Sequence, residues 1–208
     1  MDIIKKYFPE IGIAKLNTLE NLKSIYSNWN EQINVISRKD FDNFYERHVL
    51  HSLSISKIIQ FLPNTKILDV GTGGGFPGIP LAIIFPKTDF TLVDSIGKKI
   101  KVVNAVAEEI NLSNVTPLHK RADQVNDNFD FVISRAVTKF NSFVPWVKDK
   151  IIKQSNHHLK NGILALKGGD IQDELNKVKF YKSPTIFPIS NFFKEEFYTT
   201  KLIVHIPL

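Results

Sequence analysis

The residues with the clearest chemical meaning lie in the stretch 67–78, where an apolar run reaches Asp69 and the chain then enters a glycine-rich turn. Gly71, Gly73 and Gly75 can adopt positive φ values and bring backbone N–H groups against a ligand, because they carry no Cβ. Such a turn indicates a nucleotide-type cofactor. The carboxylate of Asp69 disfavours a dinucleotide cofactor, since a pyrophosphate is itself negative and gains nothing from a neighbouring acid.

A cofactor with a cationic amino-acid end does call for such an acid, and S-adenosylmethionine is one. Gly73, Gly75 and Gly78 also match the G-x-G-x-x-G spacing of nicotinamide and flavin sites, so spacing alone leaves a dehydrogenase open. The run 90–94 ends in Asp94, where a ribose-binding carboxylate belongs in either class. A turn that only joined a strand to a helix would not need acids at both strand ends. We therefore favour a methyltransferase over a dehydrogenase.

Composition suits one well-cored α/β domain with a short extension, because the chain has 208 residues and is 43% hydrophobic. No apolar run is long enough to span a membrane and the first residues lack a signal-peptide core, so we expect a cytoplasmic protein, and a monomer. The absence of cysteine excludes disulfides and thiolate metal ligands. The formal net charge of +6 is compatible with a nucleic-acid partner without establishing one.

The chain divides into two compositionally different parts, which we assign as a helical extension, residues 1–63, and a main domain, residues 64–208. In the extension, Thr18 is expected to cap one helix with a continuous apolar face, and Asp40 to cap a second whose pattern continues to Leu62. These apolar faces are expected to pack on the main domain.

Strand and helix patterns alternate in the main domain, which predicts a parallel sheet with a ligand crevice at the carboxyl ends of its strands. The expected strands are 66–70, 89–94, 115–119, 129–134 and 162–167, and the expected helices are 77–85, 97–110, 140–158 and 171–179. Residues 183–187 and 201–206 read as a closing antiparallel hairpin. This is the seven-stranded, Rossmann-like layout of class I methyltransferases, rather than the six-stranded double repeat of a dehydrogenase.

The residues after the predicted strands narrow the chemistry of the acceptor. A cysteine adduct with a pyrimidine is impossible, and residues 133–137 lack the Asn/Asp-Pro-Pro-aromatic loop typical of amine methylation. Guanine N7 carries an exposed lone pair and needs no deprotonation, so the sequence is compatible with N7 attack and no catalytic base is expected. Elimination alone does not prove this route.

Three cations and one acid are expected at the crevice. Arg121 and Asp123 follow the third strand, Arg135 the fourth, and Lys167 ends the fifth. Asp123 is placed to accept from the adenine amino group, and Arg135 to bind the cofactor carboxylate or an RNA phosphate. We expect Arg121, Arg135 and Lys167 to contact RNA, with surface ion pairing as the alternative. No metal site is expected, because His48 and His51, three residues apart on the same predicted helix, have no acid at ligand spacing.

Taken together, the chain resembles the bacterial 16S ribosomal RNA guanine-N7 methyltransferases, the glucose-inhibited division protein B family. The resemblance spans nearly the whole chain and rests on residues 34–38, 47–48, 68–80, 94–95, 97–99, 133–136 and 165–168. It implies methylation at N7 of a guanine in the decoding-region loop of 16S ribosomal RNA, on the RNA or the small subunit. It also implies cofactor contacts from a set of residues: Gly71, Phe76, Ala122, Asp123 and Arg135.

Two positions depart from the family pattern. Gly74 stands where many members have proline, and His51 where aspartate is usual. Phe76 has an alternative role as packing beneath the following helix. Two alternative functions also stay open: methylation of another RNA, and an S-adenosylmethionine-binding RNA chaperone without turnover.

Overall fold

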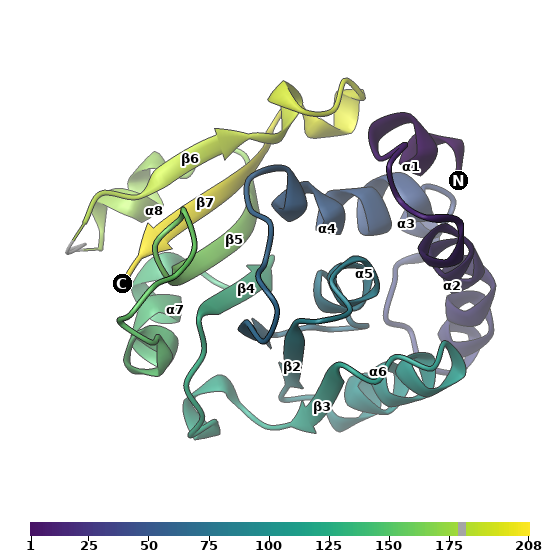
Figure 1. Ribbon diagram of the computed structural model, residues 1–208, viewed down its shortest axis with the longest axis horizontal. Helices are drawn as coiled ribbons and strands as arrows, with labels where there is room; N and C mark the ends of the chain where they lie inside the picture. The colour runs from purple at the N-terminus through teal and green to yellow at the C-terminus, as the bar shows by residue number, and fades with distance from the viewer. Residues whose placement is uncertain (179–181) are drawn as a thin grey trace.

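The structure is a computed structural model that describes residues 1–178 and 182–208, with the backbone alone for Arg38. One seven-stranded sheet, in the order β3-β2-β1-β4-β5-β7-β6, forms the centre of the molecule (Figure 1). Its strands are β1 (Lys66–Val70), β2 (Asp89–Asp94), β3 (Val115–His119), β4 (Phe131–Arg135), β5 (Gly162–Gly168), β6 (Thr185–Pro188) and β7 (Lys201–Pro207). The predicted seven-stranded sheet is confirmed.

Strands β1 to β5 pair in parallel, whereas β7 runs antiparallel to both β5 and β6. The predicted closing hairpin is therefore confirmed. The strand order reverses between β1 and β4, and ligands of open α/β sheets bind outside the carboxyl ends of the strands at such a point. The topology thus places the glycine-rich turn after β1 at the expected crevice.

The helices of the main domain are α5 (Gly78–Ile84), α6 (Gly97–Glu109), α7 (Phe140–Val147) and α8 (Gln172–Asn176). The predicted helix 140–158 is wrong beyond Val147, where a short 3₁₀ turn, η4 (Lys148–Lys150), leads into a loop. Asn161 holds that loop, since its Nδ2 donates to the carbonyls of Ile152 and Gln154. The predicted helix 171–179 is wrong beyond Asn176, where the described residues 177 and 178 form a turn, and residue 179 lies outside the described residues.

The helical extension consists of α1 (Asp2–Tyr7), α2 (Ile13–Gln32), α3 (Arg38–Phe41), the π-helical η1 (Tyr45–Leu50), α4 (His51–Leu53) and the 3₁₀ turn η2 (Ser54–Lys57). Both predicted caps are wrong. Thr18 lies inside α2, where its hydroxyl donates to the carbonyl of Ala14. Ser37 caps α3, because its Oγ accepts from the backbone N–H of Asp40. The second predicted helix is present as α3 and a continuous run of η1, α4 and η2, and it is wrong beyond Lys57.

Two apolar layers cover the sheet. The larger one joins the extension, α5 and α6 to one face, and it includes Leu19, Leu22, Ile67 and Phe131, all fully buried. The smaller one packs α7 on the other face. The predicted boundary at residue 63 stays a prediction, since a single core runs across it.

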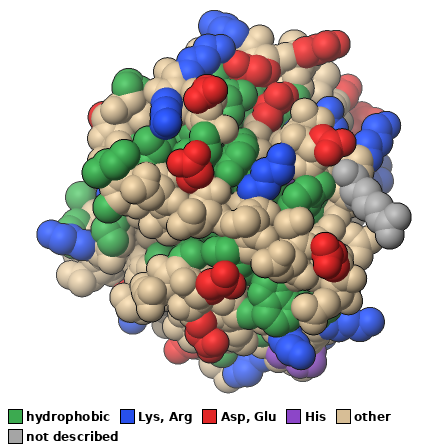
Figure 2. All heavy atoms as spheres, turned by 90° about the vertical axis from the view of Figure 1, so that its right-hand side faces the viewer, with side chains coloured by type: hydrophobic (Ala, Val, Ile, Leu, Met, Phe, Trp, Pro, Cys, Tyr) green, Lys and Arg blue, Asp and Glu red, His purple; other side chains and the backbone are tan. Residues whose placement is uncertain are grey.

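The face over α1 and α2 carries acidic and basic side chains interspersed with hydrophobic ones (Figure 2). Neither sign of charge forms a continuous patch there. Among the described helices, none combines the length and the apolar character needed to cross a membrane.

Candidate cofactor and substrate site

The turn after β1 depends on its glycines for both shape and space. Gly71, Gly73 and Gly75 have φ values of 65°, 59° and 97°, in the left-handed region that side chains disfavour. A Cβ added to Gly71 would lie 2.7 Å from a methyl group of Val137, and one on Gly75 would lie 2.6 Å from Ile79. Residues with a Cβ would therefore distort both the backbone and the packing of this turn.

Asp69 supports this turn from the protein interior. Its side chain is fully buried, and its Oδ2 accepts from the Thr72 hydroxyl at 2.7 Å and from the Gly78 N–H at 2.9 Å. Burial raises the pKa of Asp69 to about 7. The other oxygen, Oδ1, is buried without a hydrogen-bond partner. Asp69 therefore stabilises the turn from the interior of the protein.

Asp94 connects the turn to the end of β2. Its Oδ2 accepts from the Gly73 N–H at 3.0 Å, and its Oδ1 accepts from the Ile96 N–H at 2.9 Å. The ammonium group of Lys99 lies 3.9 Å from Oδ2. The carboxylate is 7% exposed and lines a cavity, so it can still accept from ligand hydroxyls.

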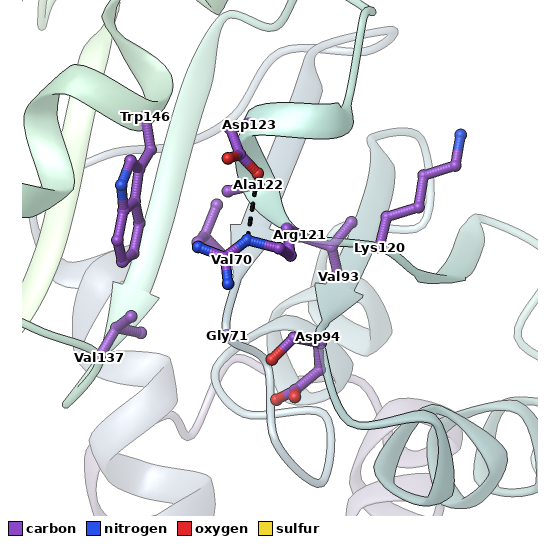
Figure 3. Close-up of a pocket in the computed structure, with 11 residues that line it drawn as sticks. Val70, Gly71, Val93, Asp94, Lys120, Arg121, Ala122, Asp123, Val137 and Trp146 are labelled. Atoms are coloured by element: carbon purple, nitrogen blue, oxygen red, sulfur yellow. Dashed lines mark ion pairs between the residues drawn. The ribbon is translucent and has the colours of Figure 1, made fainter.

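This first cavity lies at the carboxyl ends of β1, β2 and β4. Figure 3 shows Val137 and the indole of Trp146 on one side and Asp94 on the other. The residues that line it are Val70, Gly71, Val93, Asp94, Ser95, Lys120, Arg121, Ala122, Asp123, Val137 and Trp146. Sequence reasoning missed six of these residues: Val70, Val93, Ser95, Lys120, Val137 and Trp146. Val137 lies two residues after the end of β4, so its position at the carboxyl end of a strand could have indicated a cavity residue. Trp146 lies within α7, and its position in the sequence does not indicate a role at the cavity.

The predicted site residues separate into two groups. Five of them line the first cavity: Gly71, Asp94, Arg121, Ala122 and Asp123. The others do not line it: Asp69, Gly73, Gly75, Phe76, Arg135 and Lys167. Arg121 and Asp123 form an ion pair of 3.5 Å between side chains that are 60% and 53% exposed, so solvent weakens it. Of the three predicted RNA contacts, Arg121 alone has an exposed guanidinium or ammonium group.

Phe76 does not line this cavity. It is 2% exposed, and its ring centroid lies 5.0 Å from that of Tyr26. The guanidinium of Arg135 lies over the same ring, 5.1 Å from its centroid. The structure thus supports the alternative role of Phe76 as a packing residue.

Arg135 is directed away from the first cavity. Its Nη1 donates to the carbonyl of Arg47 at 3.2 Å, and its Nη2 to Nδ1 of His48 at 3.0 Å. Burial lowers the pKa of Arg135 to about 10, so it stays charged at neutral pH. Arg135 therefore belongs to a second cavity, and a contact with the cofactor carboxylate has no support in its position.

Lys167 is engaged within the protein. Its ammonium group forms a 2.7 Å ion pair with Glu174 and donates to the carbonyl of Thr138 at 2.6 Å. Glu174 also accepts from the N–H of Phe140 at the start of α7. Lys167 thus joins β5 to α7 and α8, and an RNA contact would have to break this network.

The sheet order, the glycine turn after β1 and the acid at the end of β2 define a class I methyltransferase. The fold agrees with a solved structure, precorrin-6y C5,15-methyltransferase from Geobacter metallireducens, with a TM-score of 0.53 and 12% identity over 85% of this chain and 92% of that chain. At this identity the likeness concerns the fold alone.

Sequence comparison gives the family. The profile of the family described as rRNA small subunit methyltransferase G (GidB) matches residues 15–187. The ribosomal RNA small subunit methyltransferase G of Flavobacterium johnsoniae is 54% identical over 100% of this chain and 98% of its own length. That of Christiangramia forsetii is 53% identical over 100% of this chain and 97% of its own length. The chain belongs to this family.

The cofactor of this enzyme class is S-adenosylmethionine, and the residues fit it. Asp94 offers a carboxylate at the cavity, Val137 and Trp146 offer apolar surface, and the turn leaves no room for a Cβ at Gly71. Within residues 1–178 and 182–208, no cluster of His, Asp and Glu is arranged to hold a metal ion.

Proposed function

We propose that this protein transfers a methyl group from S-adenosylmethionine to N7 of a guanine in the 16S ribosomal RNA of the small subunit. The observation that carries the proposal is full-length similarity to relatives bearing the name small subunit methyltransferase G, in a chain with an intact cofactor turn between Asp69 and Asp94. We further propose that it acts in the cytoplasm as a monomer. Sedimentation of the purified protein, with and without small subunits, tests the monomeric state.

The chemistry asks the protein chiefly to position its ligands. When bound, the cofactor supplies an electrophilic methyl group on a sulfonium. Guanine N7 is unprotonated near neutral pH, so no side chain needs to remove a proton. The two histidines nearest to Arg135 fit this expectation, because burial lowers the pKa of His48 to about 3 and that of His51 well below 6.5. Neither changes charge near pH 7.

The test is methylation of small subunits from a strain that lacks this protein. Nucleoside mass spectrometry should find 7-methylguanosine in 16S ribosomal RNA, at a single position. Single-turnover rates with saturating cofactor should be nearly flat between about pH 6.5 and 8.5. A methyl group on an exocyclic nitrogen or on another RNA would refute the proposal. Binding of S-adenosylhomocysteine without any turnover would support the chaperone alternative instead.

A further inference from the structure

The segment 33–37 joins α2 to α3, and it contains most of the stretch 34–38 on which the family resemblance partly rests. It forms neither helix nor strand. None of its residues lines the first cavity. Its contacts nevertheless connect it to the cofactor turn on one side and to the supports of Arg135 on the other.

Asn30, in the last turn of α2, holds this segment with three hydrogen bonds. Its Oδ1 accepts from the backbone N–H groups of Val35 and Ile36, at 2.9 Å each, and its Nδ2 donates to the Ile36 carbonyl at 2.8 Å. Because the side-chain amide carries both an acceptor and a donor, one residue pairs three backbone groups that have no ladder to join. Asn30 therefore fixes the backbone of the segment.

Val35 lies directly against the cofactor turn. A Cβ added to Gly74 would lie 3.0 Å from both Cβ and Cγ2 of Val35. Gly74 is not among the glycines with positive φ, so this close approach, rather than the backbone conformation, restricts the residue type here. The position of Val35 therefore limits the position of the turn.

The other end of the segment is anchored near Arg135. The Oγ of Ser37 accepts from the N–H of Asp40 at 3.2 Å. Asp40 forms a 2.8 Å ion pair with Arg47, whose carbonyl accepts from Arg135. Asp40, Arg47 and Arg135 line the second cavity, of about 490 Å³. The segment is thus held at both ends, with Val35 between them.

We propose that Asn30 is a positioning residue for the cofactor. It lines neither cavity, so it acts through the segment that it holds. By fixing the backbone of Val35, it keeps the turn at Gly73 and Gly74 in one conformation. A turn that is already ordered loses less conformational freedom when the cofactor binds. This inference rests on the cofactor part of the proposed function.

The experiment compares two asparagines that each hold a loop. Asn161 is the matched control, because its Nδ2 has three acceptors at the amino end of β5, at the opposite edge of the sheet from the cofactor turn. The variants are Asn30→Ala, Asn30→Asp and Asn161→Ala. Asn30→Asp keeps the acceptor for the two N–H groups and removes the donor. Urea unfolding measures stability, and calorimetry measures affinity for S-adenosylhomocysteine.

We expect Asn30→Ala to bind S-adenosylhomocysteine about fivefold more weakly than the wild type, and Asn30→Asp about two- to threefold more weakly. KM for S-adenosylmethionine should rise by a similar factor, whereas kcat on small subunits should change by less than about twofold. Asn161→Ala should unfold at a lower urea concentration than the wild type and bind S-adenosylhomocysteine normally. Affinity would then follow the contact with the turn rather than overall stability.

A further variant tests the step through Val35. Gly74→Ala adds a Cβ that must displace Val35, so we expect a loss of affinity for S-adenosylhomocysteine of about fivefold in the otherwise wild-type protein. In Asn30→Ala the segment is free to yield, and the same substitution should cost about twofold or less. If Asn30 had only a structural role, the two losses would be independent and would multiply.

Wild-type affinity in Asn30→Ala, or in Asn30→Asp if Asn30→Ala does not fold, would overturn the inference. Losses that multiply in the double variant, or an equal loss in Asn161→Ala, would overturn it as well. These binding measurements need no RNA. A wild type that binds S-adenosylhomocysteine but places no methyl group on N7 of guanine in small subunits would instead contradict the proposed function. The two failures are therefore distinguishable.

Discussion

The hydroxyl of Tyr26 donates a hydrogen bond of 2.5 Å to the carbonyl of Gly74. Tyr26 is fully buried in α2 of the helical extension, and Gly74 lies in the cofactor turn. The extension thus stabilises the turn directly, and a Cβ added to Gly74 would lie 3.0 Å from Val35 of the same region. The glycine that departs from the family pattern therefore fits closely against the extension.

Removing this hydroxyl should weaken cofactor binding. Tyr26→Phe leaves a buried carbonyl without its partner, so we expect stability to fall by about 1–2 kcal/mol and affinity for S-adenosylhomocysteine to fall several-fold. Tyr45→Phe is the matched control, because its hydroxyl donates to the backbone carbonyl of Glu20 at the surface, away from the turn. Urea unfolding and calorimetry measure the two effects. Equal affinities in both variants would show that the turn does not depend on the extension.

Asp94→Ala should lower affinity for S-adenosylhomocysteine by about tenfold or more, because it removes the carboxylate that we propose accepts from the ribose hydroxyls and the bond to the Gly73 N–H. Asp89→Ala removes an exposed carboxylate from the other end of β2 and should have no effect. Gly73→Val should be worse than Asp94→Ala, since its φ of 59° resists a β-branched residue. Calorimetry that finds wild-type binding in Asp94→Ala and Gly73→Val would place the cofactor elsewhere.

Asp69 should make stability depend on pH. Its pKa is raised from 3.8 to about 7, so the folded protein binds more protons than the unfolded chain between these values. Its contribution to stability therefore falls as pH rises from about 4 to 7 and is constant above. Asp69→Asn keeps an acceptor for Thr72 and Gly78 and should remove this slope, with a gain of about 2–4 kcal/mol at pH 7.

Urea unfolding at several pH values measures the difference between wild type and Asp69→Asn. The same pair tests the role of Asp69 in binding. If its free Oδ1 meets a cationic amino group, wild type should release a proton on binding S-adenosylhomocysteine at pH 7, and the variant should not. Calorimetry in two buffers of different ionisation enthalpy detects that proton. Parallel stability curves for the two proteins would argue against a raised pKa.

Arg121 and Lys167 should behave differently towards RNA. Arg121→Ala should make the plot of log affinity for small subunits against log salt shallower by about 0.7–0.9, as expected for one phosphate contact. Lys167→Ala should leave this slope unchanged and lower stability by about 1.5–3 kcal/mol, because Glu174 loses its partner. A shallower slope in Lys167→Ala with unchanged stability would restore the RNA contact that the sequence predicts.

Local signals in the sequence determined much of this fold and part of the site. Alternating strand and helix patterns identified all seven strands to within a few residues, since periodicity reflects burial on a sheet face. The acids and glycines from Asp69 to Gly78 located the turn, because positive φ restricts the residue type. Asp94 followed from its place at the end of the next strand, and it lines the cavity.

Only the tertiary structure decided which polar groups are free. The sequence predicts Lys167 as a cation at the crevice, but in the structure it is paired with Glu174. The sequence likewise predicts Arg135 as a cofactor ligand, but in the structure its guanidinium is hydrogen-bonded to His48 and Arg47. Trp146 lines the cavity from α7, a helix that is distant in sequence from the turn after β1. In each case the deciding contact joins different elements of the fold, and periodicity along the chain carries no information about which of them meet in space.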